Sequence, residues 1–170
     1  VPAMVVNGVR AVIAGPNGTR VLDVAEVVTG PGQLSLEADE FIVEFEIDRM
    51  PERSGDAYLR MTPRTEMDIA VVGAGARVTL AEDGSIKDAV VALGAVAPTV
   101  VRVPEAEAAL VGSRPDDQTL SAVAGAASEV CNPIDDKRGT IAYRKQVAGV
   151  LAKRAVLIAI ERAEQRNGTK

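Results

Sequence analysis

Histidine and tryptophan are both absent from this sequence of 170 residues. Without histidine, the chain cannot build a Cys–His or Ser–His–Asp nucleophilic site by itself. Cys131 is the single cysteine, which excludes an intrachain disulfide and a cysteine cluster for zinc or an iron–sulfur centre. Because free cysteine is commonly buried, a small apolar filler is the preferred interpretation of Cys131, ahead of a reactive thiol.

Aromatic residues are also scarce, at 2% of the chain, whereas hydrophobic residues of all kinds make up 47%. Valine, alanine, leucine and isoleucine must therefore fill the core, so close packing of small side chains matters more than a few large anchors. The 19 basic and 24 acidic residues give a net charge of -5 without a Lys/Arg block, which argues against nucleic-acid binding. A run of about 18 apolar residues is missing, so we expect no membrane span.

The opening segment, VPAMVVNGVR, does not have the form of a signal peptide, because no basic region precedes an apolar one. No initiator methionine stands first, and the segment resembles the interior of a longer protein. The length of the chain suits one ordinary domain or two small ones.

Strand patterns fill the first part of the chain. Residues 3–26 carry β-branched runs on both sides of Asn17-Gly18, a strong turn signal, and predict a hairpin. Residues 40–47 alternate with the strand period, which predicts one apolar face. The residues of that face are Phe41, Val43, Phe45 and Ile47. The polar segment that follows, DRMPERSGD, predicts a boundary between two sub-structures.

Three further strands, over residues 58–61, 69–80 and 86–93, predict an antiparallel meander. The turn signal AEDGS lies between the second and the third of them. Helical patterns come only after these strands. Strands first and helices last favour an α+β fold, in which the helices cover one face of the sheet.

Capping residues indicate where three helices begin. Pro104 suits the first turn of a short helix, and Asp116 or Asp117 can cap a second helix that runs to about Val130. Thr140 can cap the last and longest helix, which runs to about Gln165. Helical spacing predicts an apolar core face on this last helix. Its residues are Val147, Leu151, Ala155 and Ile158.

Two candidate sites carry little weight. Gly73 and Gly75 match a dinucleotide-binding fingerprint weakly, because no helix start follows them. We prefer the interpretation that these small residues let a helix pack tightly over the strand. Asp135 and Asp136 lack convergent partners for a metal ion, which favours a loop and helix-cap role.

Tyr58, Arg60 and Arg64 form a stronger candidate. Strand alternation places Tyr58 and Arg60 on the same face. A tyrosine ring can cover a flat heterocycle, and an arginine beside it can donate to a carbonyl on that heterocycle. From the residues alone, a solvated strand face is the favoured alternative, and both interpretations stay open.

Three segments of the chain resemble a known family. They are GDAYLRMTPRTEMDIAVVGAGARVTL, VVALGAVAPTVVRVPEAEAALVG and NPIDDKRGTIAYRKQVAGVLAKRAV. In this order they resemble the FAD-binding (medium) subunit of molybdenum hydroxylases, the xanthine dehydrogenase and carbon monoxide dehydrogenase family. The resemblance implies that residues 1–50 are the closing strands of an FAD-binding domain. It implies that residues 56–166 form a carbon monoxide dehydrogenase flavoprotein C-terminal-like domain, an antiparallel three-stranded sheet packed with helices.

The same resemblance implies a flavin-binding role for four residues, Tyr58, Arg60, Arg64 and Asp68. Arg60 stands where xanthine dehydrogenases often carry a lysine that faces the ring. Arg64 and Met67 fall on a loop that borders the ring in the family. Met67 differs from the acidic residue found there in some xanthine dehydrogenases, so the acceptor, whether NAD, a quinone or oxygen, stays open.

The function implied by the resemblance is that of an oxidoreductase subunit. A large partner subunit would oxidise the substrate at a molybdenum cofactor, and 2Fe-2S clusters in a small partner subunit would pass electrons to FAD. The two Gly-rich loops that hold the FAD pyrophosphate in the family do not occur in this sequence. We therefore expect the C-terminal portion of a flavoprotein subunit, as a fragment, a split subunit or a partly recovered chain, with a cytoplasmic location.

The alternative from another class is a non-catalytic α+β interaction module that assembles with partner subunits. Flavin absorbance of the purified assembly distinguishes the two hypotheses.

Overall fold

A short helix, α1 (Pro2–Val6), opens the chain, and a β-hairpin follows it. The hairpin consists of β1 (Arg10–Gly15) and β2 (Gly18–Asp23), and β5 (Phe41–Glu46) pairs with the other edge of β1. The predicted hairpin is confirmed for β1 and β2. The prediction is wrong for the first residues of the range 3–26, because Pro2–Val6 is helical. The computed structural model describes residues 1–65 and 67–166.

A bulge in β5 corrects the predicted alternation of that strand. Val12 pairs with Glu44, whereas Ile13 pairs with Ile42, so Val43 is an additional residue on β5. The additional residue shifts the alternation by one position, so residues before and after the bulge that would otherwise share a face point to opposite faces. Phe41 and Phe45 therefore lie on opposite faces of the sheet, not on one.

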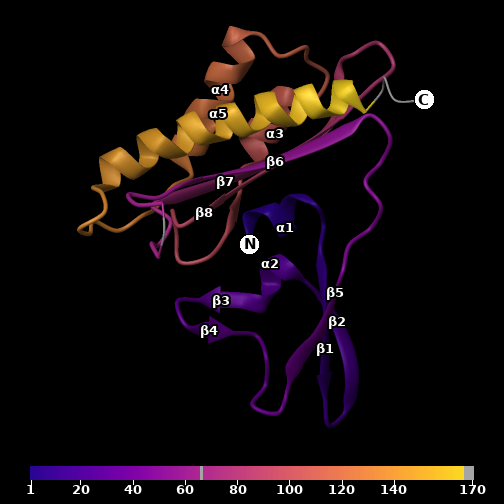
Figure 1. Cartoon of the computed structure of the whole chain (residues 1–170), viewed down its shortest axis with the longest axis vertical. Helices are drawn as coiled ribbons and strands as arrows, with labels where there is room; N and C mark the ends of the chain where they lie inside the picture. Colours follow the sequence, from indigo (N-terminus) through magenta and orange to yellow (C-terminus); the bar gives the residue numbers. More distant parts are fainter. Residues whose placement is uncertain (66, 167–170) are drawn as a thin grey trace.

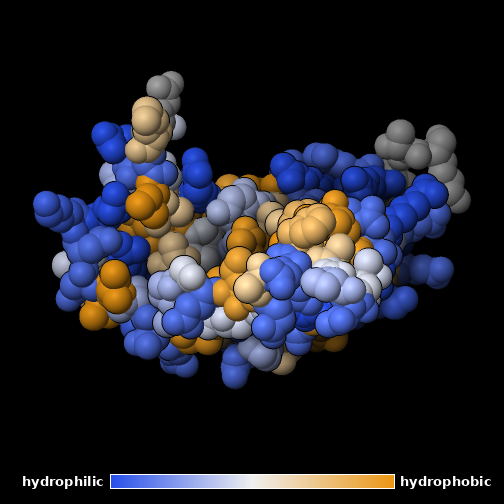
Figure 2. Space-filling model, turned by 90° about the horizontal axis from the view of Figure 1, so that it is seen from below, coloured by the Kyte–Doolittle hydropathy of each residue, from blue (hydrophilic) through white to orange (hydrophobic). Residues whose placement is uncertain are grey.

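The predicted apolar residues of β5 are nevertheless all exposed. They are Phe41, Val43, Phe45 and, just beyond the strand, Ile47. Figure 2 shows the molecule from below relative to Figure 1, from the end at which β1 and β2 lie, with hydrophobic patches between hydrophilic ones.

The segment between β2 and β5 holds a short helix, α2 (Val24–Val27), and a small two-stranded sheet. The strands of this sheet are β3 (Val28–Gly30) and β4 (Gln33–Leu34). Together with the β2-β1-β5 sheet they form what we call the N-terminal lobe, residues 7–47, which lies below the rest of the molecule in Figure 1.

The second sheet has four strands in the order β6-β7-β8-β9. They are β6 (Ser54–Met61), β7 (Val72–Leu80), β8 (Ile86–Gly94) and β9 (Val101–Arg102). All neighbours are antiparallel, as expected for a meander. The prediction of three strands missed β9, which is only two residues long and carries no periodic signal.

Three helices cover one face of this sheet (Figure 1). They are α3 (Pro104–Leu110), α4 (Asp117–Glu129) and α5 (Ile141–Gln165), as predicted. The Asp116 side chain accepts a hydrogen bond from the Thr119 amide, and the Thr140 hydroxyl accepts one from the Tyr143 amide. Both caps satisfy amides that the first helical turn leaves unpaired.

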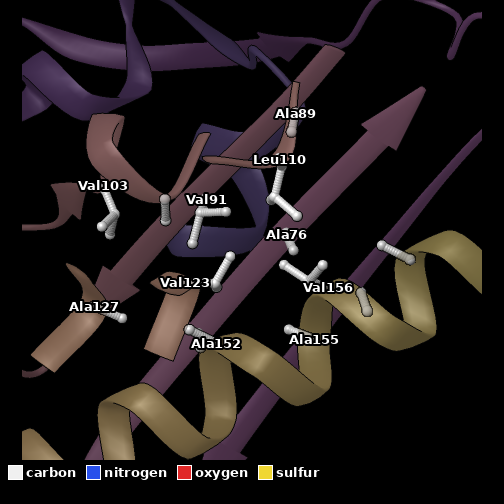
Figure 3. Packing of buried hydrophobic residues seen from close by; sticks show 14 of the residues in the cluster. Ala76, Ala89, Val91, Val103, Leu110, Val123, Ala127, Ala152, Ala155 and Val156 are labelled. Carbon is white, nitrogen blue, oxygen red and sulfur yellow. The ribbon is translucent and has the colours of Figure 1, made fainter. Parts of the chain in front are cut away.

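Alanine, rather than the larger residues expected, forms the buried face of α5. Val147, Leu151 and Ile158 are only partly buried, whereas Ala155 and Val156 are fully buried. The other buried alanines are Ala148, Ala152, Ala159 and Ala163. In Figure 3, side chains from β7, β8, α4 and α5 point toward one another across this core. Small side chains let α5 approach the sheet closely, as the scarcity of aromatic residues requires.

The other face of the sheet receives α1. This helix contacts β7 and β8, and Val6 packs with Val90 and Ala92 in a small buried cluster. A side chain at Gly75 would place its Cβ 3.1 Å from the Pro2 carbonyl oxygen. The expectation that glycine on this strand allows a helix to pack tightly is therefore confirmed at Gly75. The proposed division of the chain into residues 1–50 and 56–166 stays a prediction. The helix α1 belongs to the first part and contacts β7 and β8 of the second.

Candidate functional site

Tyr58 and Arg60 lie on the outer face of β6, the face opposite α5. Both are exposed, whereas Leu59 and Met61, on the other face, are partly buried against the core. The same-face placement predicted from the alternation is thus confirmed. Since α1 covers the neighbouring part of this face over β7 and β8, the exposed part lies at the β6 edge of the sheet.

The ring of Tyr58 leans over β7. The nearest neighbours of a Cβ placed at Gly73 would be the Tyr58 hydroxyl at 2.7 Å and two of its ring carbons. The Tyr58 side chain is still 42% exposed. An apolar ring that rests on bare backbone and keeps much of its surface open suits stacking against a second flat ring.

Arg60 places a positive charge on the same face as this ring. Within residues 1–65 and 67–166, no hydrogen bond or ion pair engages its guanidinium group. Arg60 also borders a shallow groove of about 450 Å³ between β6 and α5. The groove has apolar walls from Leu59 and Leu151, and Arg154 lies on its other side.

Asp68 is held by the protein on the loop that follows β6. Its carboxylate accepts hydrogen bonds from the Ile69 amide at 2.8 Å, from Arg138 Nε at 3.3 Å and from Arg64 Nε at 3.4 Å. Burial by itself raises the pKa of Asp68, but these three donors outweigh burial and leave the pKa below its usual value. The side chain is only 5% exposed, so its contacts organise the loop; its predicted cofactor role remains untested.

A chain of alternating charges continues from Asp68 into the helical layer. Arg138, which binds Asp68, lies 3.9 Å from Asp136, and Asp136 accepts a 2.7 Å hydrogen bond from buried Arg144. Arg144 also donates to the Val71 carbonyl at 2.7 Å. The network ties the loop after β6 to the start of α5.

Sequence reasoning missed Arg138 and Arg144 as parts of this arrangement. The adjacent carboxylates Asp135 and Asp136 were the sequence feature that could have indicated an ion-pair network here. They do serve the loop and helix start, since Asp135 accepts from the Ile141 amide and Asp136 from the Arg138 amide. Within the described residues, no group of three or more His, Cys, Asp or Glu side chains is arranged to hold a metal ion.

Arg64 and Met67 lie at the outer end of the loop. Arg64 is 70% exposed in its side chain and also donates to the Met67 carbonyl. Met67 is 96% exposed and adopts a positive φ of 48°. The neighbouring Glu66 lies outside the described residues. The structure therefore brings Tyr58 and Arg60 together on one face and sets Arg64 and Asp68 in the adjoining loop.

Cys131 takes no part in this site. It is 3% exposed, and burial raises the pKa of its thiol to about 11. The interpretation of Cys131 as an apolar filler is confirmed, because a buried thiol with a raised pKa is a poor nucleophile.

A family model for the CO dehydrogenase flavoprotein C-terminal domain matches residues 57–159, which include β6, the loop after it and most of α5. The chain belongs to this family. The resemblance drawn from the three sequence segments is thereby confirmed. So is the α+β class, since members of this CO dehydrogenase flavoprotein family share the mixed antiparallel and helical architecture described above.

Individual relatives agree with the family assignment. The chain is 30% identical to a xanthine dehydrogenase FAD-binding subunit of Escherichia coli O157:H7, over 89% of this chain and 52% of that protein. It is 32% identical to the carbon monoxide dehydrogenase medium chain of Hydrogenophaga pseudoflava, over 85% of this chain and 50% of that protein. The chain thus spans about half the length of these curated relatives.

A solved structure extends the likeness to three dimensions. Carbon monoxide dehydrogenase from Hydrogenophaga pseudoflava, in a form that lacks the Mo-pyranopterin moiety of the molybdenum cofactor, superposes with a TM-score of 0.89. The match has 32% identity and covers 95% of this chain and 56% of that one. Since nearly the whole chain is covered, the N-terminal lobe and the C-terminal sheet both follow the fold of the relative.

Proposed function

We propose that this chain is the C-terminal part of the FAD-containing subunit of a molybdenum hydroxylase. In that role it takes part in an oxidoreductase complex and helps to pass electrons from iron–sulfur clusters through FAD to an acceptor. The family membership carries the proposal, together with relatives named as a xanthine dehydrogenase FAD-binding subunit and as carbon monoxide dehydrogenase medium chains. The partners would be a large subunit with the molybdenum cofactor and a small subunit with 2Fe-2S clusters.

The exposed face of β6 fits the ring end of FAD. Tyr58 presents an open aromatic face, and Arg60 presents a cation that nothing in the described chain engages. When bound, FAD supplies a flat ring that accepts and releases electrons and gains negative charge on reduction. In this arrangement Tyr58 covers the ring, and Arg60 donates to a ring carbonyl and stabilises that charge. Arg64 and Asp68 shape the adjoining loop, with Asp68 acting through its hydrogen bonds to the protein.

Replacement of Arg60 by alanine in the complete enzyme tests this function. Charge-assisted hydrogen bonds contribute about 1.5–3 kcal/mol, so their loss should make the flavin harder to reduce and lower its midpoint potential. Potentiometric titration of the flavin band measures the effect. Reduction of the molybdenum centre by substrate serves as an internal control and should be unaltered.

Arg154→Ala is the matched control, because Arg154 carries the same charge across the same groove but lies on α5. It should leave the potential near that of the wild type. An unchanged potential in Arg60→Ala, in enzyme that retains its full FAD content, would instead make Arg60 a solvated residue of the strand face.

A non-catalytic assembly module is the second candidate, and the exposed apolar residues of β5 favour it. Phe45 and, just beyond the strand, Ile47 are 48% and 65% exposed, and neighbouring exposed apolar residues favour a surface that another protein covers. Flavin absorbance of the purified assembly distinguishes the candidates: a complex without flavin absorbance would support the module. The substrate of the complex and its acceptor stay open.

No helix in the described part of the chain has both the length and the apolar character needed to cross a membrane. The cytoplasmic location remains a proposal that cell fractionation can test.

A further inference from the structure

Two glycines on the same strand have different neighbours. Gly73 and Gly75 both lie on β7, on the face that carries Tyr58 and Arg60, because Tyr58 pairs with Gly75 and Arg60 with Gly73. A Cβ at Gly75 would meet the backbone of α1. The three atoms nearest to a Cβ at Gly73 would all belong to the Tyr58 side chain: the hydroxyl at 2.7 Å, Cε2 at 3.2 Å and Cζ at 3.3 Å.

Backbone conformation does not explain why residue 73 is a glycine. Gly73 is the second residue of β7, pairs in register with Arg60 and Gly94, and is not among the glycines with positive φ. Glycine inside a strand weakens the strand, and it often marks a place where another group must approach the backbone closely. At Gly73 the approaching group is the phenol end of Tyr58.

We propose that Gly73 is a positioning residue for the flavin site: its lack of a side chain lets the Tyr58 ring rest against the sheet. The inference rests on the proposed function. A ring that lies against the sheet leaves the space above it open for a second flat ring. With alanine at position 73 the Tyr58 ring must move outward, into the space that the flavin ring would occupy.

The fold should tolerate this substitution. The three atoms nearest to a new Cβ are the far end of one side chain, which can rotate away. Gly55 illustrates the opposite case, because a Cβ there would overlap the Ala159 carbonyl oxygen and the Ala163 amide of α5. Gly73→Ala should therefore move Tyr58 while the urea unfolding midpoint stays close to that of the wild type.

The first experiment follows the tyrosine rings of the 170-residue chain by NMR. Tyr58 and Tyr143 are the only tyrosines, so Tyr58→Phe assigns their signals. Gly73→Ala should shift the ring resonances of Tyr58 and leave those of Tyr143 in place. Gly125→Ala is the matched control, since a Cβ there would have no atom within 4 Å apart from its chain neighbours and the backbone of its own helix, and neither tyrosine should respond. Unchanged Tyr58 resonances in folded Gly73→Ala would overturn the proposal.

The second experiment uses the complete flavoprotein. Loss of one aromatic stacking contact should weaken FAD binding about 3- to 10-fold in Gly73→Ala and raise flavin fluorescence, while Gly125→Ala should change neither. In a Tyr58→Leu background, Gly73→Ala should have little further effect, because the two residues act through one contact.

The two proposals can fail separately. If Arg60→Ala lowers the flavin potential but Gly73→Ala leaves FAD affinity and fluorescence unchanged, the flavin subunit assignment stands and the role of Gly73 is wrong. If neither variant affects the flavin although Tyr58 has moved, the placement of the flavin ring on this face fails as well, and the role of Gly73 fails with it.

Discussion

Glu40 joins β2 to the loop before β5 through one carboxylate. It accepts hydrogen bonds from Arg20 at 2.8 and 2.7 Å and from the Glu37 amide at 2.9 Å. Arg20 donates in addition to the Ser35 carbonyl at 2.9 Å. Hydrogen bonds from Arg20, then from the Glu37 amide, lower the pKa of Glu40 to about 2 from a usual value of 4.5. A single bidentate pair therefore closes the segment between β2 and β5.

The lowered pKa predicts how acid affects this lobe. The charged form of Glu40 is favoured in the folded state, so its stabilisation is complete above the unfolded pKa of 4.5 and is lost as pH falls towards about 2. Thermal melts of wild type and Glu40→Gln, taken from about pH 6 down to about pH 2.5, measure this. The wild type should melt higher at the upper end, and the difference should shrink with acidification. A difference that does not depend on pH would contradict the assigned ion pair.

The helices show how far the sequence predicts elements. Asp116 and Thr140 are caps with a local mechanism, and the helices after them begin where the sequence predicts. The β1–β2 turn at Asn17-Gly18 was equally local and equally clear. In each case the signal lies within a few residues of the feature that it specifies.

Elements that depend on distant partners were harder to predict. The β-branched residues of Pro2–Val6 favoured a strand, but packing on β7 and β8 makes the segment helical. The bulge at Val43 is visible only in the pairing with β1. For the candidate site, the face of Tyr58 and Arg60 followed from alternation, whereas the contacts of Asp68 with Arg138 join residues far apart in the chain. The contact between Asp68 and Arg138 could not be predicted from local spacing.

Two adjacent residues of α5 test which side of this helix packs against the core. Val156 is fully buried and Leu157 is 42% exposed, so the two residues occupy opposite environments on one helical turn. Val156→Ala should lower the free energy of unfolding by about 1.5–3 kcal/mol, from lost burial and the resulting cavity. Leu157→Ala, which removes a larger side chain, should cost less than about 1 kcal/mol.

Urea denaturation of both variants, with the slope of the transition compared to that of the wild type, measures these costs. A larger loss in Leu157→Ala than in Val156→Ala would mean that α5 faces the sheet with a different side.

At the scale of the whole molecule, the chain would supply one part of the proposed flavin site. Tyr58 and Arg60 suit the ring, but the two phosphates of FAD require backbone donors at Gly-rich loops or helix starts. The Gly-rich loops of the family are missing from this sequence, and the chain spans 52% of the xanthine dehydrogenase FAD-binding subunit.

We therefore expect the 170-residue chain on its own to bind FAD weakly or not at all. Equilibrium dialysis with FAD measures the affinity, and riboflavin, which lacks the phosphates, is a suitable comparison. Sub-micromolar binding of FAD together with weak binding of riboflavin would contradict the expectation, because it would reveal a phosphate site within these residues.

The position of α1 has a consequence for the path of the chain. Residues before the N-terminal lobe rest on β7 and β8, and residues after it enter the same sheet as β6. In topological terms, the lobe is an insertion between two segments, α1 and β6, that belong to or contact the same sheet. Contacts between distant segments form only after the costly closure of the loop between them, so α1 should dock once β7 and β8 have paired. We therefore expect the lobe to unfold while α1 and β6 stay attached to the sheet, whereas unfolding of the sheet should release both.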